Sequence, residues 1–323
     1  MSKAIVVEAT GGPEVMVLAD REVGQPGAGQ VRVRVAAAGV NFIDTYFRTG
    51  LYKRPLPFVN GMEGAGTVEA VGSGVTEFAA GDRVTWSTVP GSYSEHVVAA
   101  PSQLIRIPSG VDEEVAAAAM LQGMTAHYLT HGVRQTRPGD TALVQAAAGG
   151  TGLLLVQTLK AAGATVFGTC STGEKEALVR GAGADDVIRY NDVDFAAAVR
   201  EKTGGRGVDV VYDGVGRATF EGSLRSLRAR GLLVLFGQAS GPVPPFDLNR
   251  LNDAGSLFIT RPSLIHYTAT RAEFEERAGA VLSAVADGTL DVRIGARFPL
   301  AQAADAHRAL EGRATTGKVL LTI

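Results

Sequence analysis

Hydrophobic and polar positions along roughly the first 100 residues follow the short, often alternating pattern of β-strands. The clearest runs are residues 3–7, 31–35, 66–71 and 83–86. Turns rich in glycine, proline or serine separate these runs, as at residues 24–27 and 72–74. Many short strands at this spacing predict a partly closed β-barrel.

The pattern then changes to helix, and afterwards to an alternation of strand and helix. Residues 112–131 start with acidic side chains and are rich in helix formers, which predicts a helix. The strands expected beyond it are residues 141–147, 165–170, 186–189, 208–213, 232–236 and 256–260. The first helix expected between them ends near residue 162. The other three cover residues 174–181, 193–203 and 218–227. Such alternation predicts an α/β fold with a doubly wound parallel sheet.

The segment after Pro262 has a third pattern. Helices are expected at residues 271–287 and 301–311, and strands at residues 293–298 and 318–323. This segment is too short for a domain of its own, so we expect it to pack back on the N-terminal β-region. The predicted organisation is one domain built from residues 1–123 and 267–323, into which a second domain, residues 124–266, is inserted.

The turn at residues 146–152 is the strongest local signal for a ligand. Its spacing, Ala146-x-x-Gly149-x-x-Gly152, joins an apolar strand to an apolar helix. Such a turn lets the backbone approach a pyrophosphate, which then faces the free N–H groups and the positive dipole end of the helix. A tight turn without a ligand explains the motif alone about equally well. Further glycines lie at other strand ends, where open α/β sheets bind ligands; they are Gly214, Gly216 and Gly237.

The end of the second strand indicates which dinucleotide fits. An acidic residue there normally binds the adenosine ribose hydroxyls, but residues 169–173 contain no carboxylate. Ser171 leaves room for a 2′-phosphate that Lys175 can neutralise, so we expect NADPH rather than NADH. A solvated helix lysine is the plainer alternative for Lys175. Tyr190, at the end of the third strand, either contacts the adenosine or is a partly buried tyrosine at the sheet edge.

Composition narrows the class of partner. The formal net charge is −2, and no basic stripe with interleaved aromatic residues is visible, so nucleic acid is not expected. No apolar stretch reaches the ~18 residues that a membrane span needs. Cys170 is the single cysteine, so no disulfide can form within the chain. We therefore expect a cytoplasmic protein.

A catalytic metal is also not expected. Zinc would need cysteine, histidine or carboxylate ligands in the N-terminal domain, which has no cysteine and carries Met62 where a histidine would be expected. His127 and His131 have the spacing of a helical zinc pair, but no glutamate lies between them. We interpret them as ordinary helix histidines.

Several motifs together resemble those of the zinc-independent, zeta-crystallin-like quinone oxidoreductases, a branch of the medium-chain dehydrogenase/reductase superfamily. The motifs are residues 41–52 (NFIDTYFRTGLY), 146–152 (AAAGGTG), 211–217 (VYDGVGR), 260–264 (TRPSL) and 313–317 (RATTG). The resemblance covers essentially the whole chain. It implies a GroES-like catalytic domain with an inserted Rossmann domain, NADPH as cofactor and a homodimer joined through the nucleotide-binding domains. The edge strand near residues 256–260 would pair across the two-fold axis.

The resemblance also implies site residues. Asn41 matches a contact on the nicotinamide side, and Tyr46 and Tyr52 match positions in the active cleft. Lys175 and Tyr190 match the adenosine-phosphate site, whereas Cys170-Ser171 departs from the small residues that similar sequences often have there. Phe236, Ser263 and Arg313 match cofactor-lining positions. The other residues expected to bind the cofactor are Thr125, Gly149, Gly150, Thr151, Gly152, Val215 and Gly237.

These residues suit hydride transfer to a quinone or another conjugated carbonyl acceptor. Such a transfer needs no protein nucleophile, but it needs close positioning and neutral donors for the negative charge that develops on the acceptor oxygen. Tyr46 and Tyr52 could donate those hydrogen bonds, although packing between domains would explain both tyrosines equally simply. Two other functions stay open, an NADPH-dependent reductase of the C=C bond in enones and alkenals, and an NADPH-binding protein with negligible turnover.

Overall fold

The computed structural model describes all 323 residues and divides into two compact units. The split unit combines Met1–Met124 with Thr270–Ile323, and the central unit is Thr125–Ala269. Each unit has its own buried apolar core.

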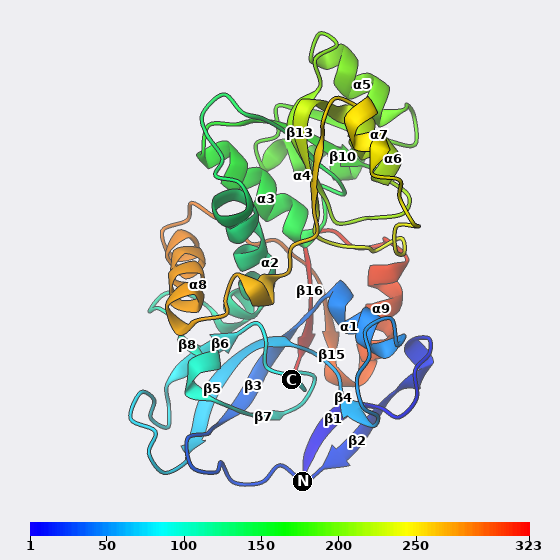
Figure 1. Cartoon of the computed structure of the whole chain (residues 1–323). Coiled ribbons are helices and arrows are strands. Elements are labelled where there is room, and N and C mark those ends of the chain that lie inside the picture. The colour runs from blue at the N-terminus through cyan, green and yellow to red at the C-terminus, as the bar shows by residue number, and fades with distance from the viewer. The chain divides into compact units, whose positions relative to one another are not determined.

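A six-stranded sheet forms the middle of the central unit (Figure 1). Its strands are β9 (Thr141–Val144), β10 (Thr165–Cys170), β11 (Asp186–Arg189), β12 (Val208–Asp213), β13 (Leu227–Leu235) and β14 (Phe258–Thr260). Their order is β11-β10-β9-β12-β13-β14, and all neighbours run parallel. The predicted doubly wound parallel sheet is confirmed. In such a sheet, ligands bind at the carboxyl ends of the strands where the order reverses, here between β9 and β12.

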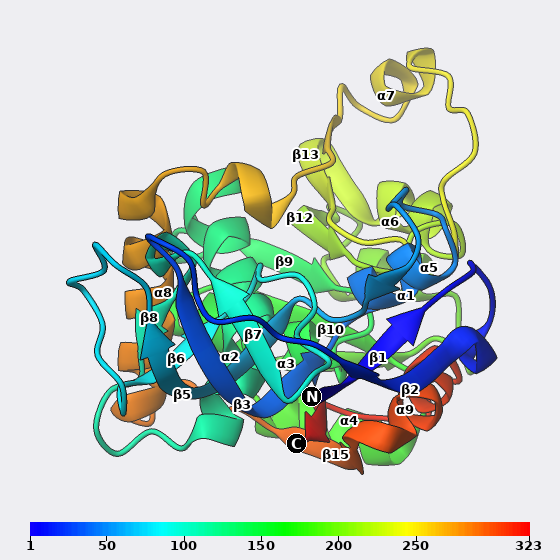
Figure 2. The same ribbon diagram turned by 90° about the horizontal axis from the view of Figure 1, so that it is seen from below.

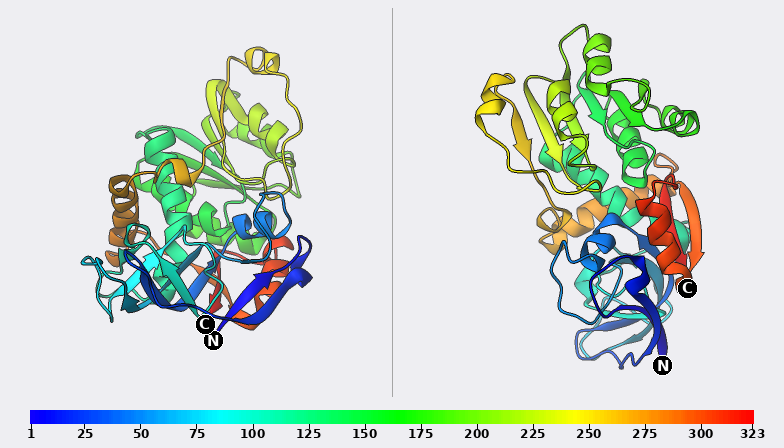
Figure 3. Two further views of the ribbon diagram at one scale, coloured as in Figure 1. Left: turned by 60° about the horizontal axis from the view of Figure 1, so that its bottom comes forward. Right: turned by 90° about the vertical axis from the view of Figure 1, so that its right-hand side faces the viewer.

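Helices alternate with these strands along the chain. They are α3 (Gly150–Ala161), α4 (Gly173–Gly181), α5 (Phe195–Lys202), α6 (Phe220–Ser226) and α7 (Asn249–Asp253). All six residues of β12 are buried, which fits a central parallel strand covered on both faces. β14 has only one neighbour and lies at the edge of the sheet (Figure 3).

Three strands of the central unit differ from the prediction, and β14 starts at Phe258 rather than at residue 256. β9 ends at Val144 rather than at residue 147. The residues that follow it form single backbone hydrogen bonds to two neighbouring strands. The Gln145 N–H donates to the Tyr212 carbonyl at 3.0 Å, and Ala146 has a left-handed φ of 51°. β13 starts at Leu227 rather than at residue 232, and continues through Arg230 at a φ of 59°.

The split unit contains a seven-stranded sheet in which β-strands from both ends of the chain pair. Its members are β3 (Val31–Val40), β5 (Glu63–Val71), β6 (Arg83–Trp86), β7 (His96–Ala99), β8 (Ile105–Arg106), β15 (Ile294–Pro299) and β16 (Lys318–Thr322). A smaller sheet has the order β2-β1-β4, from Met16–Arg21, Ser2–Val7 and Phe58–Val59. β1 and β2 are labelled in Figure 2. The β-rich fold expected here is confirmed, although β2, β4, β7 and β8 were not expected.

The C-terminal segment belongs to this sheet because β16 pairs antiparallel with β3, Val319 opposite Val40 and Thr322 opposite Ala37. β15 pairs parallel with β16. The remaining helices of the split unit are α1 (Phe42–Arg48), α8 (Arg271–Ala286) and α9 (Ala303–Glu311).

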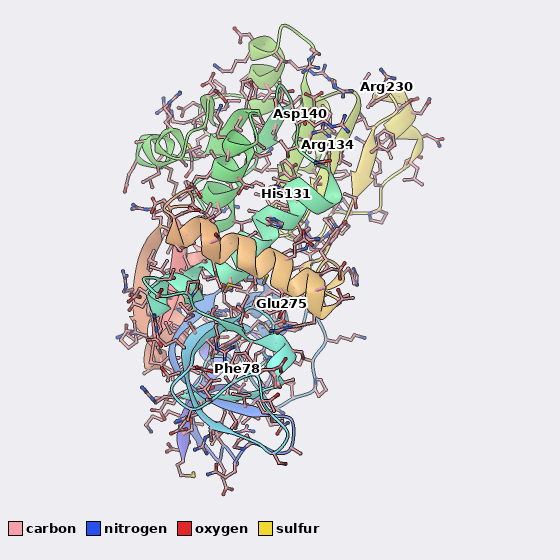
Figure 4. The ribbon with its side chains drawn as sticks, turned by 90° about the vertical axis from the view of Figure 1, so that its left-hand side faces the viewer. Phe78, His131, Arg134, Asp140, Arg230 and Glu275 are labelled. Carbon is pink, nitrogen blue, oxygen red and sulfur yellow. The ribbon has the colours of Figure 1, made fainter.

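The long helix α2 (Glu113–His127) contacts α8 through Gly123. A Cβ at Gly123 would lie 2.7 Å from the Val281 side chain, so the glycine permits a close approach of the two helices. α2 continues as one turn of π-helix, Tyr128–Val133, two residues beyond the predicted end of the helix. After that turn, Arg134 forms an ion pair with Asp140 at 2.8 Å; both residues are labelled in Figure 4.

Candidate active-site residues

The turn before α3 leaves the first N–H groups of this helix without a side-chain cap. The N-cap residue is Gly149, with an extended backbone and no capping hydrogen bond. Inside the first turn, a Cβ at Gly152 would lie 2.6 Å from the carbonyl oxygen of Ala146, so only glycine allows the helix this close to the strand end. Gly150 and Thr151 are half-buried between these two. Unpaired N–H groups at a helix N-terminus, at the carboxyl edge of a parallel sheet, fit a pyrophosphate.

Three predicted adenosine-site residues lie at the ends of β10 and β11. Ser171 and Lys175 are half-buried, and Lys175 N–H donates to the capping hydroxyl of Thr172 at 3.3 Å. The Tyr190 N–H donates to the Cys170 carbonyl at 3.1 Å, which brings Tyr190 to the end of the neighbouring strand. These contacts gather a hydroxyl, a cation and an aromatic ring at one edge of the sheet.

The loops after β12 and β13 meet at the same edge. Val215 and Phe236 are half-buried, and the Phe236 N–H donates to the Asp213 carbonyl at 2.9 Å. Gly214 and Gly237 lie so close that a Cβ on Gly237 would overlap the Gly214 backbone. The structure therefore brings the predicted residues of these two loops together.

Thr125 and Ser263, the other two predicted residues of the central unit, lie outside these loops. Thr125 is buried in the last turn and a half of α2, and Ser263 is exposed at the start of a 3-10 turn, Leu264–His266.

In the split unit, Tyr46 and Tyr52 form an aromatic pair at α1. Their ring centroids are 5.2 Å apart in an edge-on arrangement, and the Tyr52 N–H donates to the Tyr46 carbonyl at 3.0 Å. Tyr46 is buried and Tyr52 is half-buried. Asn41 immediately precedes α1, and its N–H donates to the Asp44 carboxylate at 2.9 Å. The three predicted residues therefore belong to one local structure.

The Asn41 side chain lies in a buried polar cluster that was not predicted from the sequence. Its Nδ2 donates to the Glu63 carboxylate at 2.7 Å and to the Gly39 carbonyl at 3.3 Å. Its Oδ1 accepts from Lys318 Nζ at 2.8 Å and from Gln122 Nε2 at 3.4 Å. Lys318 and Glu63 also form a direct ion pair. The long bond to Gln122 is the one Asn41 could exchange most easily for a ligand.

A weak signal for this cluster exists in the sequence. Lys318 opens a strand whose next three residues are apolar, and a cation there needs a buried partner. Glu63 directly follows Met62, the position at which a zinc-binding histidine would be expected. Its carboxylate is engaged by Lys318, Asn41 and the Leu121 N–H.

A second buried hydrogen-bond network holds two side chains of α1, Asp44 and Arg48. The Tyr93 hydroxyl donates to the Asp44 carboxylate at 2.9 Å and lies 3.2 Å from His307 Nε2. Arg48 lies 3.1 Å from His307 Nδ1 and makes a two-point ion pair with Glu311. Burial raises the pKa of Asp44 to about 7 and, with the Arg48 charge, lowers the pKa of His307 to about 3. Near neutral pH, His307 is therefore uncharged.

Arg313 lies in the turn that follows α9. It is exposed, has a left-handed φ of 57°, and its N–H donates to the Leu310 carbonyl at 3.2 Å.

The histidine pair considered as a metal site is stacked. The rings of His127 and His131 lie 4.4 Å apart and nearly parallel, and His131 Nδ1 lies 3.1 Å from the His127 carbonyl oxygen. Nowhere do three histidine, cysteine, aspartate or glutamate side chains group as they would to hold a metal ion. None of the helices combines the length and apolar character needed to cross a lipid bilayer.

Comparisons with known proteins agree over the whole chain. Residues 27–109 match the model of the alcohol dehydrogenase GroES-like domain, and residues 182–321 match that of a zinc-binding dehydrogenase. A quinone oxidoreductase of Pseudomonas aeruginosa is 47% identical, with 99% of both chains covered. A 2-haloacrylate reductase of a Burkholderia species is 44% identical, also with 99% of both chains covered.

A solved structure gives the same result. Escherichia coli quinone oxidoreductase complexed with NADPH is 42% identical and has a TM-score of 0.97, over 99% of this chain and 100% of that chain. The predicted GroES-like and Rossmann folds and the predicted family resemblance are confirmed. The chain belongs to the quinone oxidoreductases of the medium-chain dehydrogenase/reductase superfamily.

Proposed function

We propose that this protein is an NADPH-dependent quinone reductase that transfers a hydride without a metal. The observation that carries the proposal is the uncapped N-terminus of α3 at the reversal point of the parallel sheet, with Gly152 making room for it. The full-length relatives named quinone oxidoreductase support the same activity.

The residues of the central unit fit NADPH. The N–H groups at Gly150 and Thr151 would hold the pyrophosphate. Ser171 and Lys175 would hold the 2′-phosphate, in place of the carboxylate that a ribose hydroxyl would need, and Tyr190 would contact the adenosine. Val215, Phe236 and Gly237 would line the rest of the site. Thr125, Ser263 and Arg313 are further proposed contacts.

When bound, NADPH supplies the hydride from its nicotinamide ring. Asn41, oriented by Glu63 and Lys318, is proposed to place that ring. Tyr46 and Tyr52 are proposed to bound the acceptor and to donate hydrogen bonds to the oxygen on which negative charge develops. The proposed site contains no metal.

A second candidate is reduction of a polarised C=C bond, because hydride addition to an enone makes an enolate with the same need for donors. The relative named 2-haloacrylate reductase favours it. The test is steady-state turnover of 1,4-benzoquinone, 9,10-phenanthrenequinone, 2-chloroacrylate and simple enones, with NADPH and NADH side by side. Quinone turnover with NADPH supports the proposal. Turnover of the C=C substrates alone selects the second candidate, and binding of NADPH with no turnover indicates a binding protein. A large preference for NADH would overturn the cofactor assignment.

We further propose a homodimer joined through the central units and located in the cytoplasm. β14 pairs only with β13, and Phe258 on it is 61% exposed. A free edge strand with an exposed aromatic residue is a template for a second copy. The lone buried Cys170 suits a reducing compartment. Light scattering at micromolar concentration should give twice the chain mass, and Phe258→Asp should give a monomer.

A further inference from the structure

Four buried polar side chains form a continuous hydrogen-bonded line beneath the predicted cofactor loops. They come from the ends of three strands and from α6, and none is more than 3% exposed. They are Gln145, Thr169, Asp213 and Ser223, and we call them the Asp213 relay. None of them is among the residues expected to contact the cofactor.

Asp213 holds the loop after β12. Its Oδ1 accepts from the Val215 N–H at 2.8 Å and from the Gly216 N–H at 3.0 Å, and its Oδ2 accepts from the Thr219 hydroxyl at 2.7 Å. Gly216 has a φ of 88°, which strongly favours glycine. The carboxylate therefore fixes a loop whose backbone would otherwise have several conformations.

The rest of the relay connects this carboxylate to the glycine-rich turn. The Ser223 hydroxyl donates to Asp213 Oδ2 at 2.7 Å, and Gln145 Nε2 donates to Ser223 at 3.1 Å. Gln145 Oε1 accepts from the Thr169 hydroxyl at 2.7 Å. Thr169 in turn accepts from the Ala146 N–H at 3.1 Å.

All of these bonds point the same way, from the Ala146 N–H to the negative charge of Asp213. Each donor is thereby polarised by the next, and hydrogen bonds in series at low dielectric strengthen one another. The Thr169 hydroxyl, which accepts from the Ala146 N–H, holds Ala146 at its left-handed φ of 51°. This conformation costs energy for a residue other than glycine. Two loops that are 60 residues or more apart in sequence are thus held by one charge.

We propose that the Asp213 relay is a positioning device that holds the glycine-rich turn and the loop after β12 in their binding geometry before NADPH arrives. The inference rests on the proposed function in placing NADPH at this edge of the sheet. Preorganised loops lose less conformational freedom on binding, so the relay sets the affinity for the cofactor.

The test measures NADPH affinity and local opening. The variants are Asp213→Asn, which removes the charge, and Thr169→Val, which is nearly isosteric and removes the two relay hydrogen bonds of the Thr169 hydroxyl. The Kd is measured by fluorescence titration of the apo protein with NADPH. Hydrogen exchange of the Val215 and Gly216 amides is followed in the same apo protein.

Asp209→Asn is the matched control because Asp209 lies on the same strand, at its other end. It is also buried, and it accepts from the Thr141 N–H at 2.8 Å and from the Thr141 hydroxyl at 2.6 Å. A general loss of stability should affect this control as much as the relay variants.

We expect Asp213→Asn to raise the Kd for NADPH roughly tenfold and Thr169→Val roughly threefold, with faster exchange at Val215 and Gly216. The double variant Thr169→Val/Ser223→Ala should add less than the sum of its parts, since one break already interrupts the line. The control should lower the melting temperature and leave Kd within twofold of wild type.

The inference is overturned if the relay variants melt earlier but keep the wild-type Kd and exchange rates. Should Asp213→Asn fail to fold, Thr169→Val decides alone. A wild-type protein that binds NADPH but reduces no acceptor would refute the proposed function without affecting these readouts.

Discussion

Lys318 and Glu63 form an ion pair in which both side chains are almost completely excluded from water, at 1% and 0% exposure. The pair joins the last strand of the chain to β5, and both members hold the amide of Asn41. A buried pair contributes less to stability than its geometry suggests, because both charges lose their hydration. Breaking it is nevertheless costly, since the remaining charge has no partner.

Glu63→Gln is therefore expected to lower the free energy of unfolding by about 3–5 kcal/mol. The double variant Glu63→Gln/Lys318→Met removes both charges and should lose less than the single variant. Urea denaturation measures both. Lys160→Met breaks the exposed pair with Asp185 and should cost about 1 kcal/mol or less. Equal losses for the buried and the exposed pair would contradict this explanation.

Tyr46→Phe is expected to lower kcat for quinone reduction roughly tenfold or more, because it removes a donor to the developing oxyanion. The Kd for NADPH should not change. Phe47→Leu is the control, since the Phe47 ring lies 6.0 Å from that of Tyr52 and carries no hydroxyl. If Tyr46→Phe and Tyr52→Phe both keep full turnover, the tyrosines serve only for packing.

Lys175→Ala is expected to raise KM for NADPH roughly tenfold and to leave KM for NADH nearly unchanged, because only NADPH carries the 2′-phosphate. Ser171→Asp should shift the preference toward NADH by adding a ribose ligand and repelling the phosphate. Glu174→Gln is the control, as Glu174 is exposed on the same helix turn. A loss of NADH activity in that variant would instead assign Glu174 to the ribose.

The stability of the protein should depend on pH through Asp44. Burial raises the pKa of this carboxyl from 3.8 to about 7, against the hydrogen bonds from Asn41 and Tyr93. A raised pKa means that its contribution is complete below about pH 4 and is lost as pH rises toward 7. The loss is at most on the order of 4 kcal/mol.

The side chain at position 44 in the Asp44→Asn variant cannot ionise. The free energy of unfolding of this variant, relative to that of the wild type, should therefore increase as the pH rises from about 4 to about 8. Urea unfolding at several pH values measures the difference. Asp82→Asn is the control, because the Ala79 N–H lowers the pKa of Asp82 and its charge is constant above about pH 5. A flat difference for Asp44→Asn would show that its carboxyl titrates normally.

His307 acts in the opposite direction, since its lowered pKa removes stability as pH falls below about 6.5.

Gly152→Ala is expected to weaken NADPH binding at least tenfold, because the new Cβ would lie 2.6 Å from the Ala146 carbonyl oxygen and push α3 away from the turn. Gly173→Ala places a methyl group at the start of α4, where nothing lies within 4 Å. That control should bind NADPH normally. Isothermal titration measures both affinities, and equal values would refute the steric argument.

The central sheet could be predicted from the sequence because its strands are buried on both faces and read as separate apolar runs. β10, β11 and β12 have the predicted bounds for this reason. Short strands such as β4 and β8 have two residues each and leave no period to detect. The pairing of Asn41 with Glu63 and Lys318 could not be predicted either, because it depends on a contact between positions up to 277 residues apart. The hydrogen bond between Gln145 and Thr169 could not be predicted either, because it forms only when the two neighbouring strands are aligned.

The pairing of β16 with β3 also has a consequence for the order in which the protein forms. Ala37 can pair with Thr322 only after 285 further residues have been synthesised. The central unit is continuous in sequence and ends at Ala269, 53 residues before Thr322. It can therefore fold on the ribosome while β3 still has an open edge, and the last strand to emerge also brings the cation that neutralises Glu63.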